Sequence, residues 1–215
     1  MYISRIHIRK FIDAVEWSTV RNIIILANGR YSSYGSAVIR SELDKMTRTK
    51  RVPPLRKLHD QGNHAVYGSS YTKKKDVGNH HFLHDTYLRD CLAKFLHDRN
   101  LKCVEELSTR RIRENPDAHL GNIYFEFDSG HMNDDQLISK IQRNYSNNGA
   151  FRVIFFMKHR YNNPAGEHAR LAKLFELVKR TLPHKPNRIL GATYTGYLTN
   201  GKIFNLKWTG IQIQI

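Results

Sequence analysis

Residues 117–128 read DAHLGNIYFEFD, and this short stretch decides how the second half of the chain is expected to fold. From Ile123 to Asp128 larger apolar residues alternate with more polar ones, which is the pattern of a half-buried strand. Gly121 and Asn122 precede it, and such a pair is typical of a two-residue turn between antiparallel strands. The stretch therefore predicts a β-hairpin.

The register of this hairpin brings two carboxylates together. If the two turn residues form the loop, Asp117 lies directly opposite Glu126. Opposed side chains have Cβ atoms about 4.5–5.5 Å apart, so two like charges there need a cation between them. Mg²⁺ is the expected ion, with Mn²⁺ as its substitute, and Asp128 on the face of Glu126 is expected to complete the metal shell. A longer loop or a register shifted by one residue would separate the two acids.

These carboxylates belong to an acidic stretch inside a strongly basic chain. The 215 residues carry 35 Lys and Arg against 19 Asp and Glu, a net charge of +16, which favours a polyanion as partner and double-stranded DNA first. Residues 114–135 nevertheless hold six acids and no Lys or Arg. Two cysteines, no apolar run of the roughly 20 residues that cross a bilayer and no apolar segment at the start lead us to expect a cytoplasmic protein without membrane contact.

The residues around the hairpin predict an α/β order. Helical spacing of apolar residues or buried-strand composition indicates the following elements: a helix over 84–100, a strand over 101–107, a helix over 134–147 capped by Asn133, a strand over 151–157, a helix over 164–182 and two closing strands separated at Asn200-Gly201. We therefore expect residues 79–215 to form one domain with a mixed central sheet.

This order, with an acid on each of two successive strands, resembles the PD-(D/E)XK nuclease superfamily. The residues that carry the resemblance are Pro116-Asp117 and Glu126-Phe127-Asp128. Asp128 stands where the motif has its lysine. Many members of the superfamily carry that lysine on the following helix instead, and Lys140 is the residue at that place.

The stretch from His84 to Tyr145 is also similar to the replication-relaxation family of plasmids and mobile elements. The family pattern has a histidine opening the first helix, a glutamate before a Pro-Asp pair, a Glu-x-Asp-x-Gly strand end and a Lys-Ile-x-x-x-Tyr helix. The matching residues here are His84, Glu105 or Glu106, Asn115-Pro116-Asp117-Ala118, Glu126 to Gly130, and Lys140-Ile141 with Tyr145. The resemblance implies a DNA-binding protein that serves a plasmid, phage or other mobile element.

The expected chemistry is phosphodiester hydrolysis. Asp117 and Glu126 would hold the metal, and Lys140 would orient the attacking water or neutralise developing charge. Glu105 or Glu106 would be a further acidic member, since strand alternation lets only one of them face the site. Two simpler interpretations stay open: Lys140 as a solvated surface lysine, and Asp128 as the cap of a turn at Ser129-Gly130.

The basic first part predicts a winged helix-turn-helix over residues 1–78. We expect helices over 11–28, 36–46 and 52–58, a strand over 64–67 and a basic loop over 69–77. Arg56 and Lys57 on the third helix would approach the major groove, and Lys73, Lys74 and Lys75 on the loop would contact phosphate. The replication-relaxation family also carries such a domain, so the pattern and the resemblance agree.

The complete expectation is an α+β chain in which a DNA-binding domain brings duplex DNA to a Mg²⁺-dependent endonuclease or nickase. A homodimer is expected if both strands are cut, because each chain carries one site. The alternative is a DNA-binding regulator of replication or transcription that keeps the nuclease scaffold but does no chemistry, which Asp128 at the place of the motif lysine favours. An RNA-binding protein is a third interpretation that rests on charge alone.

Overall fold

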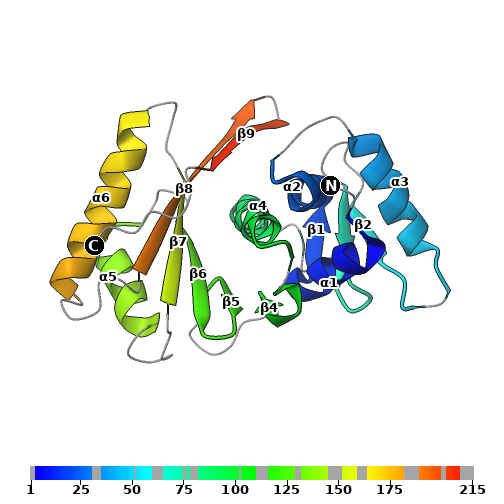
Figure 1. Ribbon diagram of the computed structural model, residues 1–215, viewed down its shortest axis with the longest axis horizontal. Helices are drawn as coiled ribbons and strands as arrows, with labels where there is room; N and C mark the ends of the chain where they lie inside the picture. The colour runs from blue at the N-terminus through cyan, green and yellow to red at the C-terminus, as the bar shows by residue number, and fades with distance from the viewer. Residues whose placement is uncertain are drawn as a thin grey trace. The chain divides into compact units, whose positions relative to one another are not determined.

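A computed structural model describes residues 3–30, 35–50, 52–59, 65–74, 77, 82–101, 103–109, 116–128, 132–144, 152–158, 164–181, 189–199 and 202–208. Over these residues the chain is α+β, as expected from the sequence (Figure 1). It divides into two compact units, Met1–Arg110 and Arg111–Ile215. Among the described residues, no helix combines the length and the apolar character needed to cross a membrane.

The N-terminal unit combines helices with a small antiparallel sheet. Its elements in chain order are α1 (Arg5–Val15), β1 (Trp17–Thr19), α2 (Val20–Asn28), α3 (Ser36–Thr47), β2 (Arg56–His59), β3 (Val66–Gly68), α4 (Phe82–Asp98), a 3₁₀ turn (Val104–Glu106) and β4 (Leu107–Ser108). Strand β3 lies between β1 and β2 and pairs antiparallel with both. The sheet therefore joins a strand between the first two helices to a hairpin that follows the third.

The helix expected over 11–28 is two helices with a strand between them. Glu16 has a φ of +65°, which ends α1, and the next three residues pair with β3. Thr19 then caps α2: its hydroxyl accepts from the backbone of Asn22, whose side chain accepts from the Thr19 backbone. The sequence pattern missed this break because every residue of β1 is buried, so the strand shows no alternation.

The third helix expected over 52–58 is also wrong, because Arg56 and Lys57 lie on strand β2. Pro53 and Pro54 cannot donate backbone hydrogen bonds, and the residues after them pair with β3, Arg56 with Gly68 and Lys57 with Tyr67. Helix α3 ends at Thr47, so the third helix of this unit is the one expected over 36–46. The strand expected over 101–107 is likewise a 3₁₀ turn followed by only two strand residues.

Helix α4 belongs to the N-terminal unit, which differs from the expected domain boundary after Gly78. Asp90 on α4 accepts from Arg21 Nε and from Asn22 Nδ2 on α2, each at 2.7 Å, and all three side chains are buried. Arg89 stacks on the ring of Trp17 at 3.7 Å and donates to the backbone oxygens of Val15 and Trp17. These contacts explain why the two units divide after Arg110 and not before α4.

The C-terminal unit contains a mixed sheet with two helices. Its elements are β5 (Ala118–Leu120), β6 (Ile123–Asp128), α5 (Asp134–Gln142), β7 (Arg152–Lys158), α6 (Pro164–Thr181), β8 (Ile189–Thr199) and β9 (Lys202–Trp208). Strands β5 to β9 lie side by side in chain order. The pairs at the two ends are antiparallel, and β6, β7 and β8 run parallel. The mixed central sheet expected from the sequence is therefore present.

Helices α5 and α6 pack on the same core beside the sheet (Figure 1). Val153 and Phe155 of β7 point into this core, and Tyr124 of β6 packs at its edge. Asn133 caps α5 as expected, since its side chain accepts from the backbone of Gln136. Because side chains alternate along a strand, Glu126 shares the face of Tyr124 and points toward α5.

Candidate functional site

The hairpin has the register predicted from the sequence. Leu120 pairs with Ile123, His119 with Tyr124 and Ala118 with Phe125. Gly121 has a φ of +54°, in the left-handed region that the turn requires. Asp117 directly precedes β5, at the position opposite Glu126.

Asp117 is held by the neighbouring strand. Its Oδ2 atom accepts a hydrogen bond from the backbone N–H of Phe127 at 2.8 Å. The side chain remains 21% exposed, so the carboxylate is anchored and still reachable from solvent. The hydrogen bond from the opposite strand thus fixes the position of this carboxylate.

Glu126 is the buried member of the pair. Its side chain is 1% exposed and faces two donors from the end of α5 and the residues after it. Lys140 donates to Oε2, and Asn144 Nδ2 donates to Oε1 at 2.9 Å. Both carboxylate oxygens of Glu126 are thus directed by side chains four residues apart along the chain.

Burial makes the ionised form of the Glu126 carboxyl unfavourable at this position. Burial, as the largest cause, and the nearby Asp117 carboxylate raise the pKa of Glu126, while Lys140 and Asn144 lower it, and the net result is a pKa of about 7. The raised pKa indicates that one lysine does not fully compensate two carboxylates in a desolvated place. The pair is therefore short of positive charge.

Lys140 contacts both acids. Its Nζ atom pairs with Glu126 Oε2 and lies 3.6 Å from Asp117 Oδ2. Burial lowers the pKa of the Lys140 amine, but Glu126 and Asp117 outweigh that effect, so the net shift is upward and the amine is charged. The side chain is 23% exposed and ion-paired, which excludes the interpretation of Lys140 as a solvated surface lysine.

Asn144 is the site residue that the sequence reasoning missed. Its side chain is buried, and it supplies the second donor to Glu126. The spacing of four residues from Lys140 was the available signal, because side chains at that spacing lie on the same face of a helix. A search for partners of the candidate lysine along its own helix would have found it.

Asp128 lies two residues after Glu126 on the same strand, and its side chain is fully buried. Within the described residues, no group of three or more His, Cys, Asp or Glu side chains is arranged to hold a metal ion. Asp117 and Glu126 are therefore the carboxylates that the structure brings together around Lys140. The turn at 129–130 that Asp128 was expected to cap lies outside the described residues.

Glu105 and Glu106 lie on the 3₁₀ turn of the N-terminal unit, and neither lies on a strand as expected. The Glu105 carboxylate pairs with Lys10 on α1, and this pairing lowers its pKa. It therefore has a partner inside its own unit.

Some of the basic residues expected to contact DNA instead contact other residues of the N-terminal unit. Arg56 donates to the backbone oxygen of Thr72 at 3.0 Å, and Lys57 pairs with Asp44 at 3.4 Å, so both tie β2 to neighbouring parts of the N-terminal unit. Lys73 and Lys74 are exposed after β3, and Lys75 lies outside the described residues. Helix α3 carries exposed residues as well, among them Val38 and Lys45.

Comparisons of this chain with protein-family models, with curated proteins and with solved structures find no match. The resemblance to the replication-relaxation family and to the PD-(D/E)XK superfamily stays a prediction from the sequence motifs. The geometry around Glu126 is independent of that resemblance.

Proposed function

We propose that the chain is a DNA-binding endonuclease or nickase that depends on Mg²⁺ or Mn²⁺ and serves a plasmid, phage or other mobile element. The observation that carries the proposal is Lys140 placed between Asp117 and Glu126 at the end of a hairpin. Two acids on adjacent strands and a lysine on the next helix make up the motif that the sequence resembles, in the variant where the lysine has moved. The resemblance implies this motif, and the contacts of Lys140 with both acids support it.

The donor set fits a magnesium ion. Mg²⁺ is usually bound by one or two carboxylates together with water and substrate phosphate, so a third protein ligand is not required. Asp117 and Glu126 would hold the ion, and the raised pKa of Glu126 is consistent with a site that lacks one positive charge. When bound, the ion would supply a Lewis acid for the scissile phosphate.

The chain's own residues would then divide the remaining work. Asp117, anchored by the Phe127 backbone, fixes the position of the acidic pair. Asn144 keeps Glu126 oriented through Oε1. The charged Lys140 amine can hold a water molecule or stabilise negative charge that develops on the phosphate, since its side chain remains partly exposed.

The N-terminal unit supports DNA binding in a different way from the one first expected. The order helix, strand, helix, helix, strand, strand with β3 central supports the proposal of a winged helix-turn-helix, in which α3 would be the third helix. Its exposed positions include Ala37, Val38, Ser41, Lys45 and, just after the helix, Arg48. Small side chains with flanking cations suit a helix that enters a groove between phosphates.

The test of catalysis is cleavage of supercoiled plasmid. We expect nicked or linear product with Mg²⁺ or Mn²⁺, none with EDTA, and at least about a 100-fold loss of rate in Asp117→Ala. Asp135→Asn is the matched control, because Asp135 lies in the same acidic stretch but is exposed on α5. Equal rates for wild type and Asp117→Ala would reject the nuclease.

The second candidate is the DNA-binding regulator without catalysis, favoured by Asp128 at the place of the motif lysine. Its test is binding of a labelled duplex at increasing salt. We expect the slope of log K against log salt to flatten by about 0.9 in Arg48→Ala, since one phosphate contact is lost. Lys57→Ala should leave the slope unchanged, because that amine pairs with Asp44. Duplex binding without cleavage would establish this second function.

A further inference from the structure

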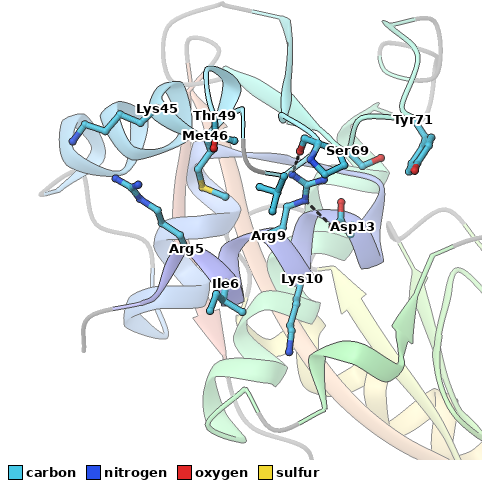
Figure 2. Close-up of a pocket in the computed structure, with 12 residues that line it drawn as sticks. Arg5, Ile6, Arg9, Lys10, Asp13, Lys45, Met46, Thr49, Ser69 and Tyr71 are labelled. Carbon is cyan, nitrogen blue, oxygen red and sulfur yellow. Dashed lines mark hydrogen bonds and ion pairs between the residues drawn. The ribbon is translucent and has the colours of Figure 1, made fainter.

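The N-terminal unit contains a pocket of about 670 Å³ (Figure 2), and Lys45 is the one lining residue that also belongs to the proposed DNA-binding face of α3. Residues of α1, of the end of α3, of the segment after α3 and of the segment after β3 line it. Its volume lies within the range of roughly 300–1,000 Å³ in which proteins hold compact ligands or a few side chains of a partner.

Exposed apolar side chains concentrate at this pocket. Five large hydrophobic side chains in the described residues are strongly exposed, and three of them line the pocket: Ile6 at 65%, Val52 at 55% and Tyr71 at 79%. Met46 and Pro53 add apolar surface to the lining. Exposed apolar side chains gathered around a concave pocket make it a candidate binding surface.

Basic side chains surround the apolar surface. Arg5, Arg9 and Lys10 of α1 and Lys45 of α3 line the pocket together with one acid, Asp13, so the charged lining residues sum to +3. All four cations already bind carboxylates: Arg9 pairs with Asp13 at 2.8 Å, Arg5 and Lys45 share a Glu42 carboxylate at 2.7 and 2.6 Å, and Lys10 pairs with Glu105. Such pairs at exposed positions contribute only about 0–1 kcal/mol, so a carboxylate from a partner can join or replace them.

We propose that this pocket docks a short acidic, amphipathic segment of a partner protein. Two or three apolar side chains of the segment would fill the space beside Ile6, Met46 and Val52, and its carboxylates would meet the basic side chains. Methionine adapts to side chains of different shapes, which suits a peptide site. A nucleic-acid strand fits less well, because Tyr71 is the one aromatic side chain in the lining on which a base could stack.

The test measures binding of labelled peptides to the full chain by fluorescence anisotropy. The probe set consists of peptides of about twelve residues in which Asp and Glu alternate with Leu, Phe or Trp. Three comparison probes are the same peptides with Ser in place of the apolar residues, the same peptides with Lys in place of the acids, and a single-stranded oligonucleotide of similar charge. We expect micromolar to sub-millimolar Kd values, typical of small transient interfaces, for the acidic amphipathic peptides alone.

The variants separate this pocket from the DNA-binding surface. Ile6→Glu should weaken peptide binding at least about tenfold, which is about 1.4 kcal/mol, and Val52→Glu should act in the same direction. Val38→Glu is the matched control, because Val38 is 66% exposed on α3 but does not line the pocket. It should leave peptide binding unchanged and weaken duplex DNA binding. Circular dichroism checks that each variant is folded.

Four results would overturn the proposal. One is the absence of any peptide in the set with a Kd below about 1 mM. Others are equal binding of the Ser-substituted peptides, or equal binding by Ile6→Glu and wild type. The last is Ile6-dependent binding of the oligonucleotide without peptide binding, which would make the pocket a nucleic-acid site. None of these results depends on whether the chain cleaves DNA.

Discussion

Each unit of the chain buries a cluster made of the same kinds of side chain, and the two clusters differ in charge and exposure. In the N-terminal unit Asp90 lies between Arg21 and Asn22, and all three side chains are buried. In the C-terminal unit Glu126 lies between Lys140 and Asn144, but a second acid, Asp117, shares the lysine. Asp117 and Lys140 are also 21% and 23% exposed.

The difference indicates which cluster holds the fold together and which has capacity for chemistry. One carboxylate facing one guanidinium and one amide in a closed place is a structural link between α2 and α4. Two carboxylates around one amine, with the pKa of Glu126 raised to about 7 by burial and by Asp117, leave charge for a ligand to neutralise. We therefore expect variants of the first cluster to change stability and variants of the second to change activity.

The largest expected effect is on a fragment that lacks the first cluster. Residues 1–110 should fold cooperatively alone, because they contain α4 and its contacts with α2. Residues 1–78 should not fold, because this fragment lacks α4. Arg21 and Asn22 would lose their hydrogen bonds to Asp90, and the apolar face of α2 would be exposed to solvent. Urea unfolding followed by circular dichroism measures this, and a cooperative transition in the shorter fragment would contradict it.

Removal of one partner of the buried pair should cost about 3–5 kcal/mol of unfolding free energy. We expect this for Arg21→Met, which removes the buried guanidinium that pairs with the Asp90 carboxylate. The fragment 1–110 is the suitable background, since Trp17 is its one tryptophan and reports on the packing of Arg89. The double variant with Asp90→Leu should recover part of the loss, and a loss below about 1 kcal/mol in the single variant would show that the pair is solvated.

The hairpin was predictable because its information is local. Strict alternation from Ile123 to Asp128 and a Gly-Asn turn determine the register without help from the rest of the chain, and the pairing of Leu120 with Ile123 confirms it. The position of Lys140 was predictable only through a family motif, since spacing alone left it equally well placed in solvent. Its contacts depend on how α5 packs on the sheet, which is tertiary information.

The errors in the elements predicted for the N-terminal unit arose because the deciding information there is not local. Strand β1 consists of three buried residues and carries no periodicity, so α1 and α2 looked like one helix. The segment around Arg56 has the composition of a helix with prolines in its first turn. It forms a strand instead, because it pairs with β3. Helix α4 was expected in the second domain because Asp90 and Arg89 look like surface charges until the residues that they contact are known.

Lys140→Met tests whether the second cluster behaves differently from the first. We expect plasmid cleavage to fall at least about 100-fold, which is about 2.7 kcal/mol of transition-state stabilisation. Unfolding free energy should fall less than in Arg21→Met, because the Lys140 side chain is 23% exposed and that of Arg21 only 5%. Lys173→Met is the control, since that lysine pairs with Asp134 of α5 at an exposed position. Unchanged cleavage together with a large loss of stability would make the cluster structural.

The smallest effect concerns Asn144, which holds the Glu126 carboxylate and is therefore a positioning residue. Asn144→Ala leaves Oε1 of Glu126 without its 2.9 Å donor, and we expect roughly a tenfold lower cleavage rate, about 1.4 kcal/mol. The Mg²⁺ concentration for half-maximal rate should rise as well, because a carboxylate free to rotate binds the ion less well. A purely structural role would leave this metal dependence unchanged. Asn22→Ala is the counterpart in the other cluster: it removes the same kind of donor from Asp90, so it should lower stability and leave the metal dependence at the wild-type value.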